Sequence, residues 1–313
     1  MFNPYKEHYF RSLTTNFMIQ SKISGVGVAL ITPFDKYEID YNALERMIEH
    51  VIGGGVDFIV ALGSIAETPT LSLVERQQVL RFVVDKTAGR VPVVAGMGSN
   101  DTHALVEHLH NFDLSGISAI LSVVPYYNKP SQEGLYQHFK AIANATDLPV
   151  VLYNVPGRVG VNMTAETTLR LANDCPNIVA IKEASGNFAQ IDDIIKNKPS
   201  HFDVISGDDG ITFPLITLGA VGVISVIGNA LPKEFSRMVR LALNGDYKNA
   251  LEIHHKFTEL FGLLFVDGNP AGVKAMLNIM GLIENQLRLP LVPARITTLG
   301  EISAIVKELN IKC

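Results

Sequence analysis

The chain has 313 residues, a net charge of −5 and a hydrophobic fraction of 47%, which suits one large domain or two ordinary ones. No apolar run reaches the roughly 18 residues that span a bilayer, and no basic cluster indicates nucleic-acid binding. The two cysteines, Cys175 and Cys313, form no metal-ligand spacing and no disulfide framework. We therefore expect a cytoplasmic protein with no nucleic-acid, membrane or metal partner.

Residues 1–22 differ in composition from the rest of the chain. They contain scattered basic and aromatic residues but lack the continuous apolar stretch of a secretory signal. We expect a poorly ordered N-terminal extension here. A short transit peptide, or a true start at Met18, are the alternatives.

From residue 25 onward, short β-branched runs alternate with longer amphipathic segments. The apolar runs predict eight strands, at 26–31, 58–62, 91–95, 119–124, 150–153, 178–182, 203–206 and 222–226. Helical periodicity predicts the helices 41–52, 73–87, 102–112, 132–143, 165–172, 188–196 and 210–218. Strands that are apolar on both faces are typical of parallel sheets covered by helices. Eight such units predict a (β/α)₈ TIM barrel over residues 23–232.

A doubly wound open sheet is the alternative fold, but no G-x-G-x-x-G motif follows the first strand. Residues 233–313 are mostly helical in pattern, with breaks at Gly281 and Leu289-Pro290. This is more chain than one closing helix requires. We therefore expect a helical C-terminal subdomain packed on the barrel.

Lys182 stands at the end of an apolar strand, which is an unusual place for a lysine. Removing an ammonium from water costs several kcal/mol, and lysines in such surroundings lose their proton more easily. A neutral amine attacks carbonyl groups, so Lys182 is a candidate for Schiff-base formation. The alternative is a side chain that reaches solvent or pairs with Glu183.

A TIM barrel carries its active site at the C-terminal ends of its strands. The residues at those ends include Ser64, Tyr127, Tyr153, Arg158, Lys182, Gly207 and Ile224. Strand alternation places Lys182 on the same inner face as Ala180, and Tyr153 on the same face as Val151. No His or Cys stands at a strand end as a metal ligand. One lysine and two tyrosines are therefore expected to meet at the mouth of the barrel.

Six segments in chain order carry a resemblance to a known family: PYYNKP at 125–130, SQEGLYQHFK at 131–140, LYNVPGR at 152–158, IKEASGN at 181–187, SGDD at 206–209 and GVISV at 222–226. With them, residues 25–309 resemble the dihydrodipicolinate synthase family of pyruvate-dependent class I aldolases and lyases. The resemblance implies condensation of pyruvate with L-aspartate 4-semialdehyde through a lysine Schiff base, in diaminopimelate and lysine biosynthesis. It also implies no metal or organic cofactor, and a homotetramer built as a dimer of dimers.

The same resemblance implies roles for the residues at the strand ends. Lys182 forms the Schiff base, and Tyr153 moves protons together with Ser64 and Tyr127. In the family, Tyr127 reaches the site from a neighbouring subunit. Arg158 holds the carboxylate of the second substrate, which a guanidinium can bind through two hydrogen bonds. Gly207 and Ile224 line the substrate pocket with their backbone.

Three positions depart from the family pattern. Ser64 and Ile65 stand where threonines are usual, and Ala66 replaces a customary glycine. Ile65 lacks the hydroxyl that contributes to the pyruvate carboxylate site, although its backbone N–H remains. If nothing replaces the lost charge-assisted bond, pyruvate binding is expected to be weaker by about 1.5–3 kcal/mol; a compensating water is the alternative. The turn at Ala66 must tolerate a Cβ.

Three further expectations concern residues outside the chemistry. Glu67 is expected to bond backbone N–H groups in its own loop, and Asp208 and Asp209 to cap the following helix. Regulation by lysine is expected to be weak or absent. Asn100 and Tyr126 match the family's lysine site, but the histidines and the glutamate of inhibited relatives are replaced by Leu73, Arg76 and Ala104.

Two other functions stay open at this point. One is a different lyase of the same superfamily, acting on a sialic acid or a 2-keto-3-deoxy sugar acid. Arg158 and Tyr127 favour the synthase over it. The other is a catalytically silent barrel that only binds a partner, against which the presence of Lys182, Tyr153 and Arg158 speaks.

Overall fold

In the computed structural model, which describes residues 23–311, eight parallel strands close into a barrel. The strands are β1 (Gly25–Ala29), β4 (Phe58–Ala61), β5 (Val93–Gly96), β6 (Ile117–Val123), β7 (Val150–Asn154), β8 (Ile178–Glu183), β9 (Asp203–Ser206) and β10 (Gly222–Ser225). Each strand pairs with the next one along the chain, and β10 pairs with β1. The predicted TIM barrel is confirmed.

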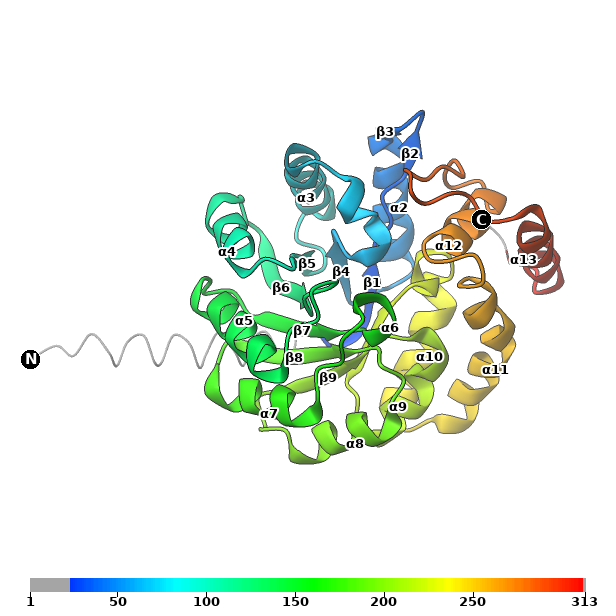
Figure 1. Ribbon diagram of the computed structural model, residues 1–313. Coiled ribbons are helices and arrows are strands. Elements are labelled where there is room, and N and C mark those ends of the chain that lie inside the picture. Colours follow the sequence, from blue (N-terminus) through cyan, green and yellow to red (C-terminus); the bar gives the residue numbers. More distant parts are fainter. Residues whose placement is uncertain (1–22, 312–313) are drawn as a thin grey trace, which may run out of the picture.

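A layer of helices surrounds the strands (Figure 1). It consists of α2 (Tyr41–Gly53), α3 (Leu73–Thr87), α4 (Thr102–Asn111), α5 (Gln132–Asn144), α7 (Ala165–Asp174), α8 (Phe188–Asn197), α9 (Thr212–Leu218) and α10 (Pro232–Leu243). Side-chain caps fix where several of them begin. At α3, for example, Ser72 and Glu75 form a reciprocal capping box. Because the helices cover the barrel, its strands are buried on both faces.

The C-terminal part adds helices beyond the barrel. Helix α10 packs against β1 between α9 and α2 and so completes the layer. It is followed by α11 (Tyr247–Leu263), α12 (Ala271–Ile279) and α13 (Ile296–Glu308). Helix α11 packs on α10, and α12 packs on α13. The boundary at residue 232 stays a prediction, and the extension expected at 1–22 lies outside the described residues.

Two short elements near the mouth of the barrel were not predicted from the sequence. Strands β2 (Phe34–Asp35) and β3 (Glu38–Ile39) form an antiparallel hairpin after β1. The one-turn helix α6 (Pro156–Val159) follows β7. Within residues 23–311, no helix combines the length and apolar character needed to cross a membrane.

Candidate active site

Lys182 and Tyr153 are neighbours across the β7–β8 pair and face the barrel interior. They are direct register partners, and each is only 6% exposed. The Lys182 Nζ atom lies 4.3 Å from the centre of the Tyr153 ring. Within residues 23–311, this nitrogen takes part in no hydrogen bond or ion pair. The alternative of a solvated lysine, or one paired with Glu183, is therefore wrong.

Gly207 leaves room for the lysine side chain. It follows β9, and its N–H donates to the Glu183 carbonyl at 2.8 Å. A Cβ at this position would lie 2.7 Å from the Ala184 Cβ and 3.1 Å from the Lys182 Cε. Ile224, in β10, is buried and pairs with Gly27 of β1. The space around the lysine thus depends on the missing side chain at position 207.

On the opposite face of the same strands, Glu183 and Asn154 form the next register pair. The Glu183 carboxylate is fully buried and accepts from the Asn154 Nδ2 at 3.1 Å, the Gln190 Nε2 at 3.3 Å and the Ser185 N–H at 2.8 Å. Burial raises its pKa, although these hydrogen bonds act against the rise. Asn154 also accepts from the Met163 N–H at 3.0 Å. Sequence reasoning missed this network, which fastens the ends of β7 and β8.

Ser64, Ile65 and Ala66 form a tight 3₁₀ turn directly after β4. Ser64 is exposed, whereas the Ile65 side chain is 3% exposed and belongs to the core. The Ala66 N–H donates to the Gly63 carbonyl at 3.1 Å, and the Thr32 hydroxyl donates to the Ala66 carbonyl at 2.8 Å. Ala66 does not have a positive φ. The turn therefore tolerates the Cβ, as expected.

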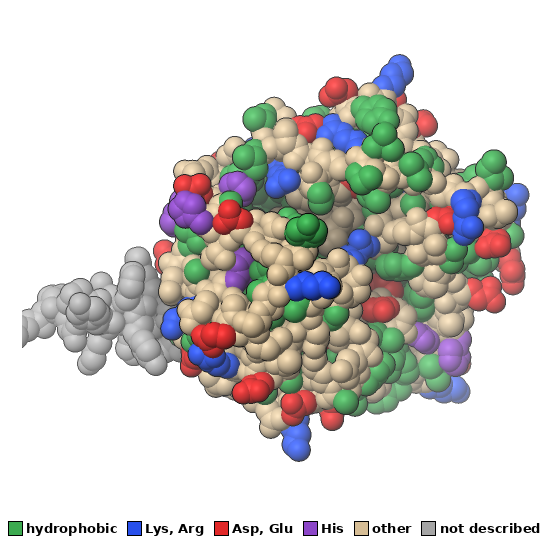
Figure 2. Space-filling view, in the orientation of Figure 1, with side chains coloured by type: hydrophobic (Ala, Val, Ile, Leu, Met, Phe, Trp, Pro, Cys, Tyr) green, Lys and Arg blue, Asp and Glu red, His purple; other side chains and the backbone are tan. Residues whose placement is uncertain are grey.

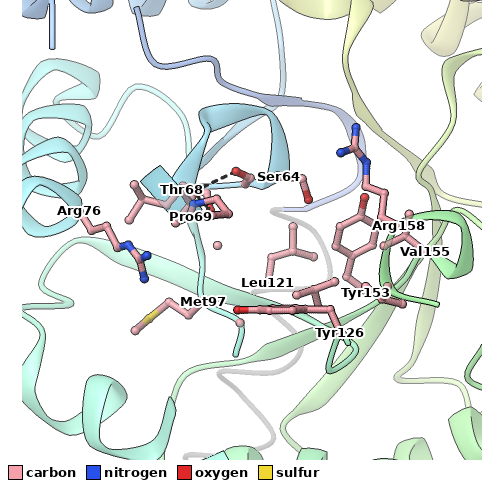
Figure 3. Close-up of a pocket in the computed structure, with 16 residues that line it drawn as sticks. Ser64, Thr68, Pro69, Arg76, Met97, Leu121, Tyr126, Tyr153, Val155 and Arg158 are labelled. Carbon is pink, nitrogen blue, oxygen red and sulfur yellow. Dashed lines mark hydrogen bonds between the residues drawn. The ribbon is translucent and has the colours of Figure 1, made fainter. Parts of the chain in front are cut away.

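A cavity of about 250 Å³ brings Ser64, Tyr153 and Arg158 together. Figure 3 shows Tyr153 and Arg158 on one side of it and Arg76 on the opposite side. Much of its wall is apolar, from Leu62, Pro69, Met97, Leu121, Val123, Val155 and Val159. An apolar cavity with a few polar groups is typical of small-molecule sites. In the space-filling view, the same face of the molecule is hollowed near its centre, with Lys or Arg side chains beside the hollow (Figure 2).

Not all predicted site residues line this cavity. Lys182 does not, but it lies against Tyr153, which does. Ile65, Gly207 and Ile224 are also absent from its wall. Arg158 lies on α6, and its Nη2 donates to the Asn269 carbonyl at 3.1 Å. The guanidinium is thereby held beside the cavity by a residue of the C-terminal part.

Tyr127 does not line the cavity of its own chain. It is 88% exposed and has a left-handed backbone with φ of 72°. Its neighbour Tyr126 lines the cavity instead. The loop is held by Asn128, whose Nδ2 donates to the Asn100 carbonyl at 2.8 Å. Of the predicted hydroxyl relay, the structure therefore brings together Ser64 and Tyr153 but not Tyr127.

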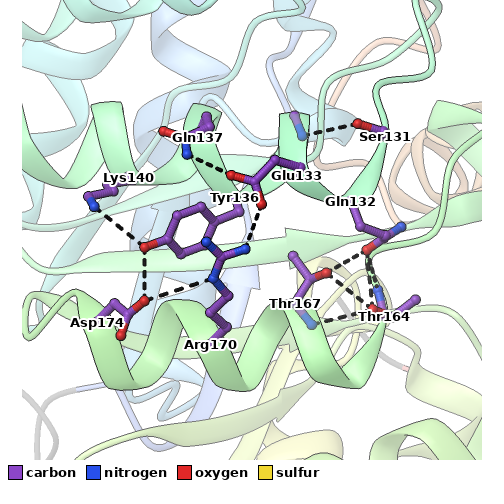
Figure 4. Close-up of polar contacts among 11 residues, drawn as sticks. Ser131, Gln132, Glu133, Tyr136, Gln137, Lys140, Thr164, Thr167, Arg170 and Asp174 are labelled. Atoms are coloured by element: carbon purple, nitrogen blue, oxygen red, sulfur yellow. Dashed lines mark hydrogen bonds and ion pairs between the residues drawn. The ribbon is translucent and has the colours of Figure 1, made fainter.

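Polar contacts between α5 and α7 anchor the segment that follows the Tyr127 loop (Figure 4). At the start of α5, the Gln132 Oε1 accepts from the Thr167 hydroxyl at 2.7 Å and from the Thr164 N–H at 3.1 Å. Further along, the Tyr136 hydroxyl donates to Asp174 at 2.8 Å, and the Arg170 guanidinium lies 3.5 Å from the centre of the Tyr136 ring. The two helices are thus fixed to each other beside the site.

Asp208 and Asp209 were both expected to cap the following helix, but only Asp208 does so. Asp208 caps the next turn by accepting from the Gly210 N–H at 2.8 Å, as predicted. Asp209 does not cap: it is buried and accepts from the N–H groups of Val226 at 3.0 Å and Ile227 at 2.7 Å. Burial raises the pKa of Asp209 to about 6, against the effect of these hydrogen bonds. Its partners come from a later strand end, which local sequence cannot reveal.

Glu67 is the second correction. It was expected to bond N–H groups of its own loop, but its carboxylate accepts from the Lys274 ammonium and from the Arg288 N–H, the latter at 2.9 Å. Both partners belong to the C-terminal part. The Glu67 carboxylate therefore ties the loop after β4 to a segment more than 200 residues away.

The comparisons with known proteins all indicate the same family. Residues 22–309 match the sequence model of the Dihydrodipicolinate synthetase family. A protein of Phocaeicola vulgatus named 4-hydroxy-tetrahydrodipicolinate synthase is 69% identical over 95% of this chain and 100% of its own length. A monomeric dihydrodipicolinate synthase variant is 41% identical, with a TM-score of 0.91 over 94% of this chain and 98% of that one. The Acinetobacter baumannii dihydrodipicolinate synthase complexed with pyruvate is 40% identical, with a TM-score of 0.90 over 93% and 100%.

Proposed function

Because this chain belongs to the dihydrodipicolinate synthetase family, we infer that it condenses pyruvate with L-aspartate 4-semialdehyde to 4-hydroxy-tetrahydrodipicolinate. The enzyme is a lyase of diaminopimelate and lysine biosynthesis that works through a lysine Schiff base. The observation that carries this function is the buried Lys182 amine, which has no polar partner within residues 23–311 and lies against Tyr153. An amine so placed is available to a keto acid.

The reaction follows from the chemistry of that amine. The neutral amine of Lys182 attacks the ketone carbon of pyruvate, and loss of water leaves an iminium ion. The iminium draws electrons from the methyl group, which gives up a proton and becomes an enamine carbon. This carbon attacks the aldehyde of the second substrate and forms the new C–C bond, while the aldehyde oxygen takes up a proton. The amino group of that substrate then displaces Lys182 and closes the ring.

We assign the proton transfers to a relay of hydroxyl groups. Tyr153 supplies the hydroxyl nearest to the lysine, which its position against Nζ supports, and Ser64 follows on the same cavity. A phenol is a poor base on its own, so the relay depends on hydrogen-bonded partners. Tyr127 is the third member. Its exposure and its absence from its own cavity fit entry into a neighbouring subunit's site.

The substrate carboxylates need separate partners. Arg158 binds the carboxylate of aspartate semialdehyde, consistent with its place beside the cavity. For pyruvate we propose the backbone N–H groups at the start of the Ser64–Ala66 turn, because the first N–H groups of such a turn have no acceptor within it. The backbone at Gly207 and Ile224 completes the pocket. Ile65 supplies an N–H but no hydroxyl.

The proposal extends to the oligomeric state and the cellular location of the protein. We propose a cytoplasmic homotetramer, a dimer of dimers, in which Tyr127 completes the partner's relay. The monomeric variant among the similar structures makes the oligomeric state a property to measure for this chain. Sedimentation analysis of the wild type and of Tyr127→Phe separates assembly from catalysis. Equal assembly with a lower kcat in the variant supports the assigned role.

Trapping with borohydride tests the function directly. Wild-type protein is reduced with borohydride in the presence of pyruvate and mapped by mass spectrometry, with Lys182→Arg as the matched control. We expect a pyruvate adduct at Lys182 only in the wild type, and turnover when aspartate semialdehyde is added. An unmodified Lys182 would contradict the proposal. Turnover of a sialic acid, in place of pyruvate and aspartate semialdehyde, would also contradict it.

A further inference from the structure

Lys274 and Glu67 form an ion pair whose side chains have no exposed surface at all. Lys274 comes from α12, and Glu67 directly follows the Ser64–Ala66 turn. The Lys274 Nζ also donates to the Gln286 carbonyl at 3.0 Å and lies 4.3 Å from the centre of the Phe34 ring. Burial lowers the pKa of Lys274 to about 8, against the effect of Glu67, so the side chain keeps its proton at neutral pH.

Stability is a weak explanation for such a pair. Taking two opposite charges out of water is expensive, and an uncharged pair of similar volume often folds as well or better. Removing only one partner is the harmful change, because it leaves a buried charge alone. The presence of this buried ion pair therefore needs an explanation other than a contribution to the free energy of unfolding.

The pair belongs to a cluster that joins the C-terminal part to the mouth of the barrel. The Arg288 N–H donates to Glu67 at 2.9 Å, and its guanidinium donates to the Thr70 carbonyl at 3.0 Å and to Glu75 at 2.6 Å. The same side chain donates to the Tyr37 carbonyl of the β2–β3 hairpin at 2.9 Å. Figure 1 shows the orange segment after α12 running beside this hairpin. The loop after β4 is thus held from outside the barrel.

Glu67 connects this cluster to the proposed pyruvate site. Its backbone is left-handed, with φ of 54° and ψ of 34°, a conformation that a non-glycine residue keeps only where its surroundings hold it. After it, the Thr68 hydroxyl reaches back across the turn and donates to the Leu62 and Gly63 carbonyls at 2.9 and 3.0 Å. The turn with Ser64 is therefore closed by the Thr68 hydroxyl and held at its C-terminal end by the Glu67 carboxylate.

We propose that the Glu67–Lys274 pair positions the Ser64–Ile65 turn for pyruvate, so that the C-terminal part sets the geometry of the imine-forming step. The inference rests on the proposed function. Glu67 and Lys274 are positioning residues, since neither lines the cavity. They act through the hydroxyl of Ser64 and the N–H groups of its turn. Arg158 stands on α6 and is held by the Asn269 carbonyl rather than by the Glu67–Lys274 pair, so binding of the aldehyde is unaffected.

Two variants test the proposal. Glu67→Gln keeps the shape but removes one charge, and Glu67→Gln with Lys274→Met removes both while keeping an acceptor for the Arg288 N–H. The control is Glu75→Gln, which weakens the partly exposed Glu75–Arg288 pair in the same cluster and retains the capping box. Each protein is measured by urea unfolding, by kcat and KM for both substrates, and by single-turnover trapping of the pyruvate imine.

We expect the double variant to unfold at a urea concentration close to that of the wild type. Its rate of imine formation and its kcat/KM for pyruvate should fall on the order of tenfold or more, since small displacements at a reacting site are costly. The KM for the aldehyde should stay unchanged. Glu75→Gln should differ from the wild type by less than about twofold, because partly exposed pairs contribute little.

Three results would overturn the proposal. The first is a stable double variant with wild-type imine formation. The second is an equal loss in the Glu75→Gln control. The third is loss of folding in both test variants, because the pair would then be a requirement of stability. Failure of the proposed function is a different observation: a folded wild type that forms no imine with pyruvate.

Discussion

The buried carboxylate of Asp209 leads us to predict how the stability of the protein changes with pH. It accepts two backbone N–H groups next to the end of β10 and has no exposed surface to speak of. Burial raises its pKa from 3.8 to about 6. Replacing it by asparagine keeps a carbonyl acceptor for the same N–H groups but removes the titration. The variant Asp209→Asn therefore isolates the contribution of this one group.

The sign and size follow from the difference between the folded and unfolded pKa values. Because the folded value is raised, the folded protein binds the proton more tightly, and acidification stabilises it relative to the unfolded chain. The shift of the Asp209 pKa from 3.8 to about 6 corresponds to about 3 kcal/mol in total. This stabilisation is absent above pH 7 and complete below pH 4. About 1 kcal/mol of it develops between pH 7 and pH 5.

Urea unfolding at pH 7, 6 and 5, at one protein concentration, measures the effect. We expect the stability of the wild type to rise relative to Asp209→Asn by about 1 kcal/mol as the pH falls from 7 to 5. Asp208→Asn is the matched control, because Asp208 is exposed and caps a turn next to the same position. A constant difference between wild type and Asp209→Asn over this range would refute the reasoning.

Three other outcomes are expected. Gly207→Ala should lower kcat on the order of tenfold while Lys182 remains trappable by pyruvate and borohydride, because the new Cβ crowds the Lys182 Cε at 3.1 Å; an unchanged kcat would contradict this. Ile65→Thr should lower the KM for pyruvate by about tenfold through the restored hydroxyl, and steady-state kinetics showing no change would disprove it. Micromolar L-lysine should not halve the activity, because Leu73, Arg76 and Ala104 stand where inhibited relatives carry histidines and a glutamate, which leaves the lysine amine without an acidic partner; half-inhibition in that range would overturn the expectation.

The sequence allowed the barrel and much of the site to be predicted, for identifiable reasons. Runs such as the one at β8 are apolar on both faces, and only a covered parallel sheet explains eight of them. Helical periodicity predicted the bounds of α3 as observed, and in the structure the capping box of Ser72 and Glu75 fixes its start. Strand alternation sufficed to place Lys182 and Tyr153 inside the barrel.

The remaining features depend on contacts between distant segments. The β2–β3 hairpin was missed because strands of two residues carry no periodicity. Glu67 and Lys274 are 207 residues apart, and nothing local to either indicates the other. Asp209 stands where a helix cap is usual, so its actual partners after β10 could not be inferred. Burial of charged groups is decided by tertiary packing, which a linear pattern does not record.

The pairing of Tyr153 with Lys182, and of Asn154 with Glu183, has a consequence for how this chain can vary. The two pairs are one position apart on the same strands but face opposite ways. A single-residue slip would turn the carboxylate inward and bury the amine among the helices. Such a protein could still close its barrel and resist heat, yet it would be inert towards keto acids. A single-residue insertion or deletion in β7 or β8 is therefore expected to abolish the chemistry even where the barrel still folds.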